Sequence, residues 1–249
     1  TKVQTALIFS TLSSGVNYTC GIVSSGATYC WGNNAVGQFG NNSTSSSSTP
    51  TRAAQNKMLK ALSAGDHHTC AIDTLNVGWC WGNNPNGELG NKTYNNSKVP
   101  TKINGSLQLS AISSGRYHSC ATDLAGKAYC WGENSSGQIG DTTWIQRNIP
   151  SPVTSANVFS QIVAGYEHTC AIISAGRAYC WGKNDRGQLG IASQTNANAP
   201  QLVKGGLTWK QIAAADLNTV GVTLGNVGYY WGAIGSPWPQ VNTPTRLPF

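Results

Sequence analysis

A period of 50 residues runs through almost the whole 249-residue chain and limits what it can fold into. Its fourth copy reads AGYEHTCAIISAGRAYCWGKNDRGQLG, residues 164–190. A fixed repeat of this length indicates an array of equivalent supersecondary units, because no single unit can bury its apolar face alone. The residues that recur at this step are Cys20, Cys30, Cys70, Cys80, Cys120, Cys130, Cys170 and Cys180, then Trp31, Trp81, Trp131, Trp181 and Trp231, then Pro50, Pro100, Pro150 and Pro200.

Each unit contains four short segments that favour β-strand. They are rich in β-branched and aromatic residues and are separated by Gly, Asn and Pro, a pattern typical of a four-stranded antiparallel sheet. We predict that the extended piece after each proline is the first strand of its unit. These pieces are residues 1–3, 51–53, 101–103, 151–153 and 201–203. In the fourth copy the remaining strands are then 159–165, 168–172 and 178–182.

The cysteine pairs favour disulfides over metal sites, since no CxxC motif or close Cys/His spacing occurs. If Cys20 faces Cys30, residues 24–26 form a three-residue hairpin loop whose last position requires the left-handed region. Gly or Asn occupies that position in all five units. In this register each cysteine pair is a non-hydrogen-bonded pair, where opposed Cβ atoms come closest. Four disulfides imply an oxidising, extracellular compartment, and Val220 facing Tyr230 replaces the fifth pair.

Composition supports a secreted β-rich chain, because only 10% of residues are charged and Ser, Thr, Asn and Gly take their place. The net charge of +7 is scattered, with no reader module that would indicate a nucleic-acid partner. No signal peptide or long apolar run is present, so we expect a mature chain without a membrane span. Possible glycosylation sequons begin at Asn17, Asn41, Asn42, Asn91, Asn95, Asn104 and Asn134.

Candidate functional residues are few. His68, His118 and His168 share one repeat position with Tyr18 and Asn218, so we interpret it as a structural tie rather than a metal or catalytic site. The five periodic tryptophans are interpreted as core. No nucleophile and base spacing is visible, so we expect no enzyme, no metal and no cofactor. Four aromatic residues outside the repeat pattern are candidate partner contacts: Tyr94, Trp144, Trp209 and Trp238.

The combination of GxxHTCA, a Gly-containing turn, CWGxN and GQLG within one period resembles the regulator of chromosome condensation repeat, from residue 1 to about 232. The resemblance implies an all-β propeller with one four-stranded blade per repeat. The paired cysteines resemble the extracellular branch of that family. Nothing matches the wedge of its nucleotide-exchange members, so that activity is not expected. The predicted single domain, 1–249, divides into repeats 1–50, 51–100, 101–150, 151–200 and 201–243, with 244–249 as a further strand.

That further strand motivates the functional hypotheses. Residues 244–246 repeat the opening of a unit six residues early, although residues 1–3 are expected to supply that strand. One strand therefore either closes the ring or completes a sheet of a neighbouring subunit, which would give a head-to-tail polymer. The sequence could also belong to a longer array of about seven repeats. We predict a secreted protein-interaction or assembly module that binds a protein partner or itself. Alternatives are a glycan-binding propeller and an enzyme inhibitor.

Overall fold

Five separate four-stranded antiparallel sheets make up a computed structural model of the chain, which describes residues 7–54, 56–235 and 239–247. In every sheet the strands pair in sequence order. The first sheet contains β1 (Phe9–Ser14), β2 (Tyr18–Val23), β3 (Thr28–Gly32) and β4 (Ser47–Ala53), and the second contains β5 (Leu59–Ala64), β6 (His68–Asp73), β7 (Gly78–Gly82) and β8 (Ser97–Lys102). The third contains β9 (Leu109–Ser114), β10 (His118–Asp123), β11 (Ala128–Gly132) and β12 (Arg147–Pro152). The fourth contains β13 (Phe159–Ala164), β14 (His168–Ile173), β15 (Ala178–Gly182) and β16 (Ala197–Leu202), and the fifth contains β17 (Trp209–Ala214), β18 (Asn218–Thr223), β19 (Gly228–Gly232) and β20 (Val241–Arg246).

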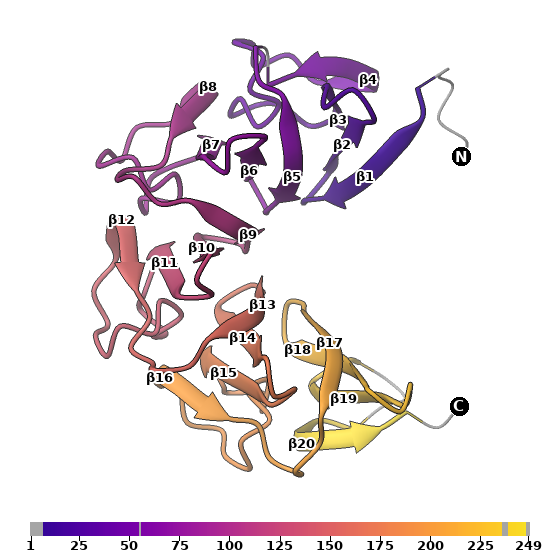
Figure 1. Ribbon diagram of the computed structural model, residues 1–249, viewed down its shortest axis with the longest axis vertical. Coiled ribbons are helices and arrows are strands. Elements are labelled where there is room, and N and C mark those ends of the chain that lie inside the picture. The colour runs from indigo at the N-terminus through magenta and orange to yellow at the C-terminus, as the bar shows by residue number, and fades with distance from the viewer. Residues whose placement is uncertain (1–6, 55, 236–238, 248–249) are drawn as a thin grey trace.

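The sheets follow one another along an open arc, with the first and fifth sheets at its two ends (Figure 1). The first strand of each sheet lies on the inside of the arc, and neighbouring inner strands are in contact from β1 to β17. This arrangement of blades confirms the predicted fold class. Within the described residues, no helix is long and apolar enough to cross a bilayer.

The hairpin inside each blade has the predicted register. Cys120 pairs with Cys130 across β10 and β11, and the four bonded cysteine pairs each have a Cα–Cα distance of 4.1 Å, as the close pair of an antiparallel ladder requires. The three-residue loop ends in a positive φ, for example 78° at Gly126 and 65° at Asn76. In the fifth blade Val220 pairs with Tyr230 without a covalent bond.

The prediction for the strand after each proline is wrong in one respect. Thr51 lies in β4 and pairs with Cys30, so this segment is the last strand of the preceding sheet and not the first of the next. A sequence period defines the length of a unit but not its start, and an edge strand can pair with either neighbouring sheet. Likewise Thr245 of β20 pairs with Tyr230, which completes the fifth sheet of the same chain. Residues 1–3, the predicted competitor, lie outside the described residues.

Because strands alternate in direction, each blade has two ends that define two faces of the arc. The axial-turn face carries the turns between the first and second strands, at 15–17 and each later repeat, together with the long loops after the third strands. The hairpin face carries the loops between the second and third strands, at 24–27 and each later repeat, together with the links from one blade to the next.

Candidate functional site

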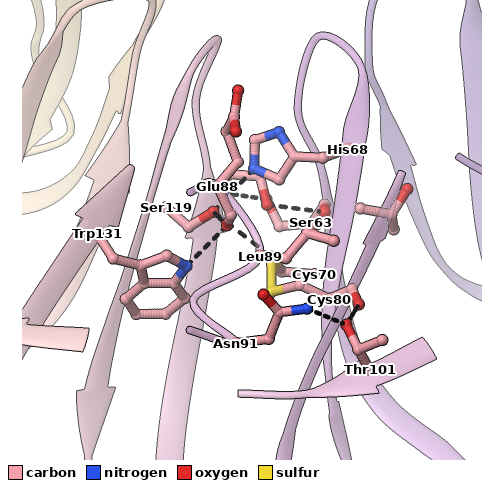
Figure 2. The surroundings of a disulfide bond; sticks show 12 residues. Ser63, His68, Cys70, Cys80, Glu88, Leu89, Asn91, Thr101, Ser119 and Trp131 are labelled. Atoms are coloured by element: carbon pink, nitrogen blue, oxygen red, sulfur yellow. Dashed lines mark hydrogen bonds between the residues drawn. A yellow bond between two sulfur atoms is a disulfide. The ribbon is translucent and has the colours of Figure 1, made fainter. Parts of the chain in front are cut away.

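Neighbouring blades are joined by a hydroxyl held between a histidine and a carbonyl (Figure 2). His68 Nε2 lies 2.8 Å from Ser119 Oγ of the following blade, and Ser119 Oγ donates to the Glu88 backbone carbonyl at 2.9 Å. Since the Ser119 proton is used there, the hydroxyl accepts from His68 Nε2–H. The same contact recurs as His118 with Thr169 and Gln138, and as His168 with Thr219 and Gln188. The interpretation of these histidines as structural ties is confirmed.

This geometry makes the three histidines difficult to protonate. Their Nδ1 atoms are buried and have no hydrogen-bond partner among the described residues, so a proton there would leave an uncompensated charge. Desolvation lowers the pKa of His68 and His118 to about 3 and that of His168 to about 4. The low pKa values therefore follow from burial at blade interfaces and do not indicate catalysis.

The periodic tryptophans complete the same interfaces. Trp131 Nε1 donates to the Glu88 carbonyl at 2.7 Å, and Trp81 and Trp181 bind the equivalent carbonyls of Gln38 and Gln138. Each of these three rings is completely buried. They are core residues, as the sequence predicts, and are not available as sugar platforms.

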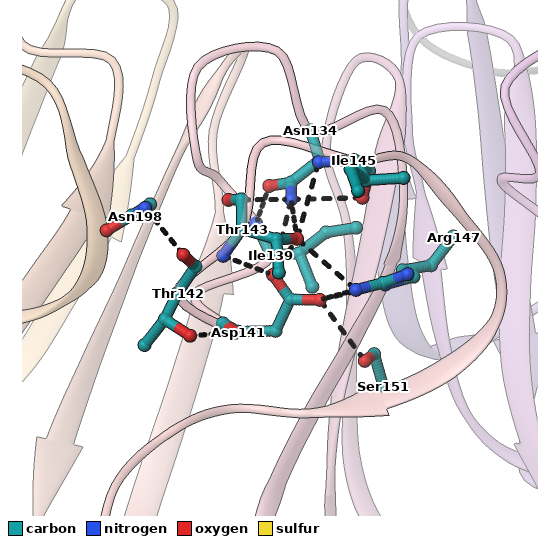
Figure 3. Close-up of polar contacts among 9 residues, drawn as sticks. All are labelled: Asn134, Ile139, Asp141, Thr142, Thr143, Ile145, Arg147, Ser151 and Asn198. Atoms are coloured by element: carbon teal, nitrogen blue, oxygen red, sulfur yellow. Dashed lines mark hydrogen bonds and ion pairs between the residues drawn. The ribbon is translucent and has the colours of Figure 1, made fainter.

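The Asn of each CWGxN motif holds together the long loop that follows it (Figure 3). Asn134 Nδ2 donates to the carbonyls of Thr143 and Ile145, both at 3.1 Å, and Asn134 Oδ1 accepts from the Ile139 amide at 2.9 Å. At the end of this loop Thr142 N donates to the Asn198 carbonyl of the next blade at 2.9 Å. The motif thus folds a loop that also holds the adjacent blade.

Replacing Asn134 with Asp is expected to destabilise the protein by about 2 to 4 kcal/mol, because an oxygen would face two carbonyls and a buried charge would be unpaired. Urea unfolding measures the loss. Asn95→Asp is the matched control, since this side chain is exposed and the change should stay within about 0.5 kcal/mol. Equal losses at both positions would contradict the structural role of Asn134.

The structure also separates the predicted sequons. Asn134 is completely buried with its amide occupied, so its prediction as a glycosylation site is wrong. Asn134 is the asparagine of the CWGxN motif, and its buried structural role leaves it inaccessible for glycosylation. The other six are exposed or partly exposed: Asn17, Asn41, Asn42, Asn91, Asn95 and Asn104. Glycosylation at these six stays a prediction.

The aromatic residues predicted as partner contacts have different locations. Tyr94 and Trp144 are about half exposed, on equivalent loops of neighbouring blades. Trp209 is buried at the start of β17, with its ring 5.1 Å from that of Trp231, so its assignment to a surface contact is wrong. Its position is the apolar one that Phe159 fills in the fourth blade. Trp238 lies outside the described residues.

A further set of side chains, which the sequence reasoning missed, meets on the inside of the arc. We call it the axial mouth. It consists of one residue from the same repeat position of each blade, lining a hollow of about 370 Å³: Val16, Asp66, Arg116, Tyr166 and Asp216. The turns approach one another closely, since Asp66 N donates to the Gly115 carbonyl at 3.3 Å and Tyr166 N to the Ala215 carbonyl at 3.0 Å. A Cβ on Gly115 would lie 2.2 Å from the Gly165 oxygen, which explains the glycine before this position.

Charge and aromatic surface are combined at the axial mouth. The Arg116 guanidinium lies 3.6 Å from the centroid of the Tyr166 ring and 4.5 Å from that of Tyr117, and its Nε is 3.5 Å from Asp66 Oδ2. Burial raises the pKa of Asp66, while Arg116 opposes that rise and Asp216 adds to it. Asp216 is exposed. Two carboxylates against one guanidinium leave an excess of negative charge.

In the sequence, this site is distinguished by residues that vary between units and not by residues that repeat. The flanking Gly recurs in four of the five units and the HTC-type strand follows it, whereas the two-residue segment between them has a different sequence in every unit. Side chains that maintain the fold recur, so the fold does not require one particular side chain at this position. No cluster of three or more His, Cys, Asp or Glu side chains suited to a metal occurs in the part of the chain that the structure describes.

Comparison with solved structures identifies the same architecture elsewhere. Human WBSCR16 has a TM-score of 0.89 at 18% identity, over 99% of this chain and 68% of that chain. Yeast RCC1 (Prp20), solved bound to Kap60, has a TM-score of 0.84 at 21% identity, over 97% and 61%. The ectodomain of the receptor kinase CR4 from Physcomitrella patens has a TM-score of 0.65 at 25% identity, over 93% and 54%. The chain thus spans between half and about two thirds of the length of these chains.

Sequence comparison identifies the family. A comparison with curated protein sequences gives no match. Two profiles of the regulator of chromosome condensation (RCC1) repeat do match, one at residues 110–138 and 159–188, the other at 25–72, 79–122, 125–172 and 175–222. Because the second profile covers four successive repeats and most of the chain, this protein belongs to the RCC1 repeat family.

Proposed function

We propose that this protein is a secreted, non-enzymatic interaction module that binds a protein partner at the axial mouth. The observation that carries the proposal is that one repeat position around a common hollow holds four different kinds of side chain in the five blades. Each of these residues lies in a short turn between two paired strands, so the side chains are already oriented before binding. The excess negative charge favours a partner that inserts Lys or Arg between Asp66 and Asp216.

Two lines of support come from relatives and from covalent structure. Related propellers bind proteins, since yeast RCC1 was solved with Kap60 and Prp20p was studied for binding to Gsp1p and histones. Four disulfides and no free cysteine in the described chain favour an oxidising compartment. The similarity to a receptor kinase ectodomain is consistent with that location.

The structure bears on one half of the polymerising hypothesis, since β20 forms the fourth strand of the fifth sheet beside β19 of the same chain. Residues 1–3, the other strand of that hypothesis, lie outside the described residues, so strand exchange stays a prediction. We propose the axial mouth as the partner site because its side chains are described.

A site-specific cross-link tests the proposal. A photo-reactive phenylalanine analogue at Val16, which is 42% exposed, should capture a defined protein from the extracellular fraction of the source organism. The Arg116→Ala change should reduce capture about tenfold or more, as loss of a central interface arginine does. Arg186→Ala, an exposed arginine on the same face, is the matched control, and an analogue at Ser25 tests the hairpin face. Equal capture from Val16 and Ser25, or capture unaffected by Arg116→Ala, would refute the proposal.

Glycan binding stays as a second candidate because Tyr94 and Trp144 are exposed aromatics at equivalent loop positions, one repeat apart. Aromatic rings of this kind can stack on sugar faces. A glycan array with the parent protein and with Trp144→Ala separates the two functions, since the axial variants should not alter a sugar signal. An array without hits would remove this candidate.

A further inference from the structure

The hairpin face carries nearly the whole net charge of the protein. Of the nine acidic residues, only Asp73 and Asp123 lie on this face, and both accept hydrogen bonds from amides of their own turns. Nine of the sixteen basic residues lie at or beside it. Exposed examples are Lys60, Lys102, Lys127, Arg177, Lys204 and Lys210. The axial-turn face carries the other seven acidic residues and is close to neutral.

The same face projects single aliphatic side chains into solvent. Leu75, Leu124 and Leu224 lie on the hairpin loops of three blades and are 73%, 63% and 63% exposed. Met58 and Val158, on the links between blades, are 51% and 55% exposed. These side chains come from four of the five blades and lie on the same side of the molecule.

The loops that carry these side chains are held in place. Leu124 N donates to the Gln108 carbonyl at 3.0 Å, and Leu224 N donates to the Thr208 carbonyl at 3.0 Å, which ties each hairpin loop to the link that precedes its blade. The side chains are therefore presented by a rigid scaffold and do not fold back onto the core. Combined with the basic residues of the same face, these exposed aliphatic side chains make the hairpin face the candidate interaction surface.

We propose that the hairpin face docks on an anionic lipid bilayer. The exposed Leu, Met and Val side chains would enter the boundary between headgroups and acyl chains, and the basic side chains would bind lipid phosphates or carboxylates. Charge complementarity selects an anionic surface, since basic residues near a bilayer attract acidic lipids. The exposed aliphatic side chains favour lipid over a polysaccharide or nucleic acid. Polysaccharides are bound through aromatic stacking and hydrogen bonds and nucleic acids through phosphate contacts and base stacking, whereas separate Leu, Met and Val side chains add affinity by entering an apolar phase. Docking leaves the axial mouth open on the opposite face.

Vesicle co-sedimentation of the intact, oxidised chain tests this inference. Binding to phosphatidylcholine vesicles containing about a third phosphatidylserine should exceed binding to pure phosphatidylcholine by about tenfold or more, and should weaken with salt. Two variants separate the contribution of the basic side chains from that of the aliphatic side chains. Lys127→Glu/Arg177→Glu/Lys204→Glu should lose about tenfold or more in affinity, and Leu75→Ser/Leu124→Ser/Leu224→Ser should lose a comparable factor at unchanged charge.

Matched variants on the axial-turn face serve as controls. Lys92→Glu/Lys98→Glu/Arg186→Glu changes the net charge equally, and Tyr94→Ser/Trp144→Ser removes exposed aromatic surface, so both should bind vesicles within about twofold of the parent. Melting curves verify that all variants fold. Equal binding to neutral and anionic vesicles, or an equal loss in the axial-turn controls, would overturn the proposal. A serine variant that binds like the parent would show a purely electrostatic polyanion contact, and would also overturn it.

Discussion

Lowering the pH from 7 to 5 is expected to destabilise this protein by several kcal/mol, and replacing three histidines should remove most of that loss. His68, His118 and His168 have folded pKa values of about 3, 3 and 4 against an ordinary value of 6.5. Below pH 6.5 the unfolded chain therefore binds protons that the folded chain excludes, so stability falls as the pH falls. Above pH 6.5 these groups contribute no pH dependence.

The size of this effect follows from the shifts. One pKa unit corresponds to about 1.4 kcal/mol, so each histidine costs about 2 kcal/mol at pH 5 and the three together cost about 6 kcal/mol. That is a large fraction of the typical stability of a domain, about 5 to 15 kcal/mol. We expect Tm to fall by roughly 10 to 20 °C between pH 7 and pH 5.

Carboxyl groups do not produce the same loss of stability between pH 7 and pH 5. The pKa values of Asp73 and Asp141 are lowered by hydrogen bonds that outweigh desolvation, so their contribution is lost only as the pH falls through and below 3.8. Burial raises the pKa values of Glu88 and Asp66, which makes their contribution opposite in sign to that of the histidines. The region between pH 6.5 and 5 therefore reports mainly on the histidines.

Scanning calorimetry of a His68→Gln/His118→Gln/His168→Gln variant provides the control. Each glutamine keeps an N–H donor for the neighbouring hydroxyl but cannot be protonated, so the difference in Tm between pH 7 and pH 5 should fall to a few degrees. The fifth blade already has Asn218 at this position, so a side-chain amide is compatible with the blade. A variant with the pH dependence of the parent would show that other groups control acid unfolding.

Truncating Trp131 is expected to be the most damaging single substitution. The ring is completely buried between the second and third blades, in a cluster with Leu89, Ile103 and Leu109. Trp131→Ala would leave a cavity and cost about 3 to 5 kcal/mol. Trp131→Phe should cost less, about 1 to 2 kcal/mol, because it keeps most of the ring and loses the bond to the Glu88 carbonyl.

Trp31 is the matched control, because it is the same residue type at the same repeat position but in the first blade of the arc. It occupies the same repeat position but lies at the start of the arc, is partly exposed, and packs on Phe9 of its own blade at 5.5 Å between ring centroids. Trp31→Ala should therefore cost about half as much as Trp131→Ala in urea unfolding. Equal costs would mean that contacts between blades contribute little to stability.

Most of the blade could be predicted from the sequence because local geometry determines it. The position of Gly126 and the spacing of Cys120 and Cys130 are enough to define the hairpin register, and the Asn and Gly of the following motif define a turn. The assignment of the edge strand failed because Thr51 is placed by long-range pairing with Cys30, and a strict period describes either assignment equally well.

The candidate site residues are harder to predict from the sequence, because residue identity does not mark them. Trp209 differs in identity from the residues at its repeat position, but it belongs to an apolar position where the other blades have Phe or Leu. The axial residues do not recur, so a repeat pattern does not reveal them, and only their variation within a constant frame distinguishes the position. No local pattern indicates that Asp66, Arg116 and Tyr166 meet, since their proximity arises from stacking blades around one axis.

We propose that recurring positions hold the arc together and that the variable axial positions recognise a partner. This claim is tested most directly by measuring how the protein captured at Val16 binds the Arg116→Ala/Tyr166→Ala/Asp216→Asn variant. We expect binding to fall about a hundredfold while Tm stays within a few degrees of the parent. Undiminished binding by a folded variant would contradict the claim.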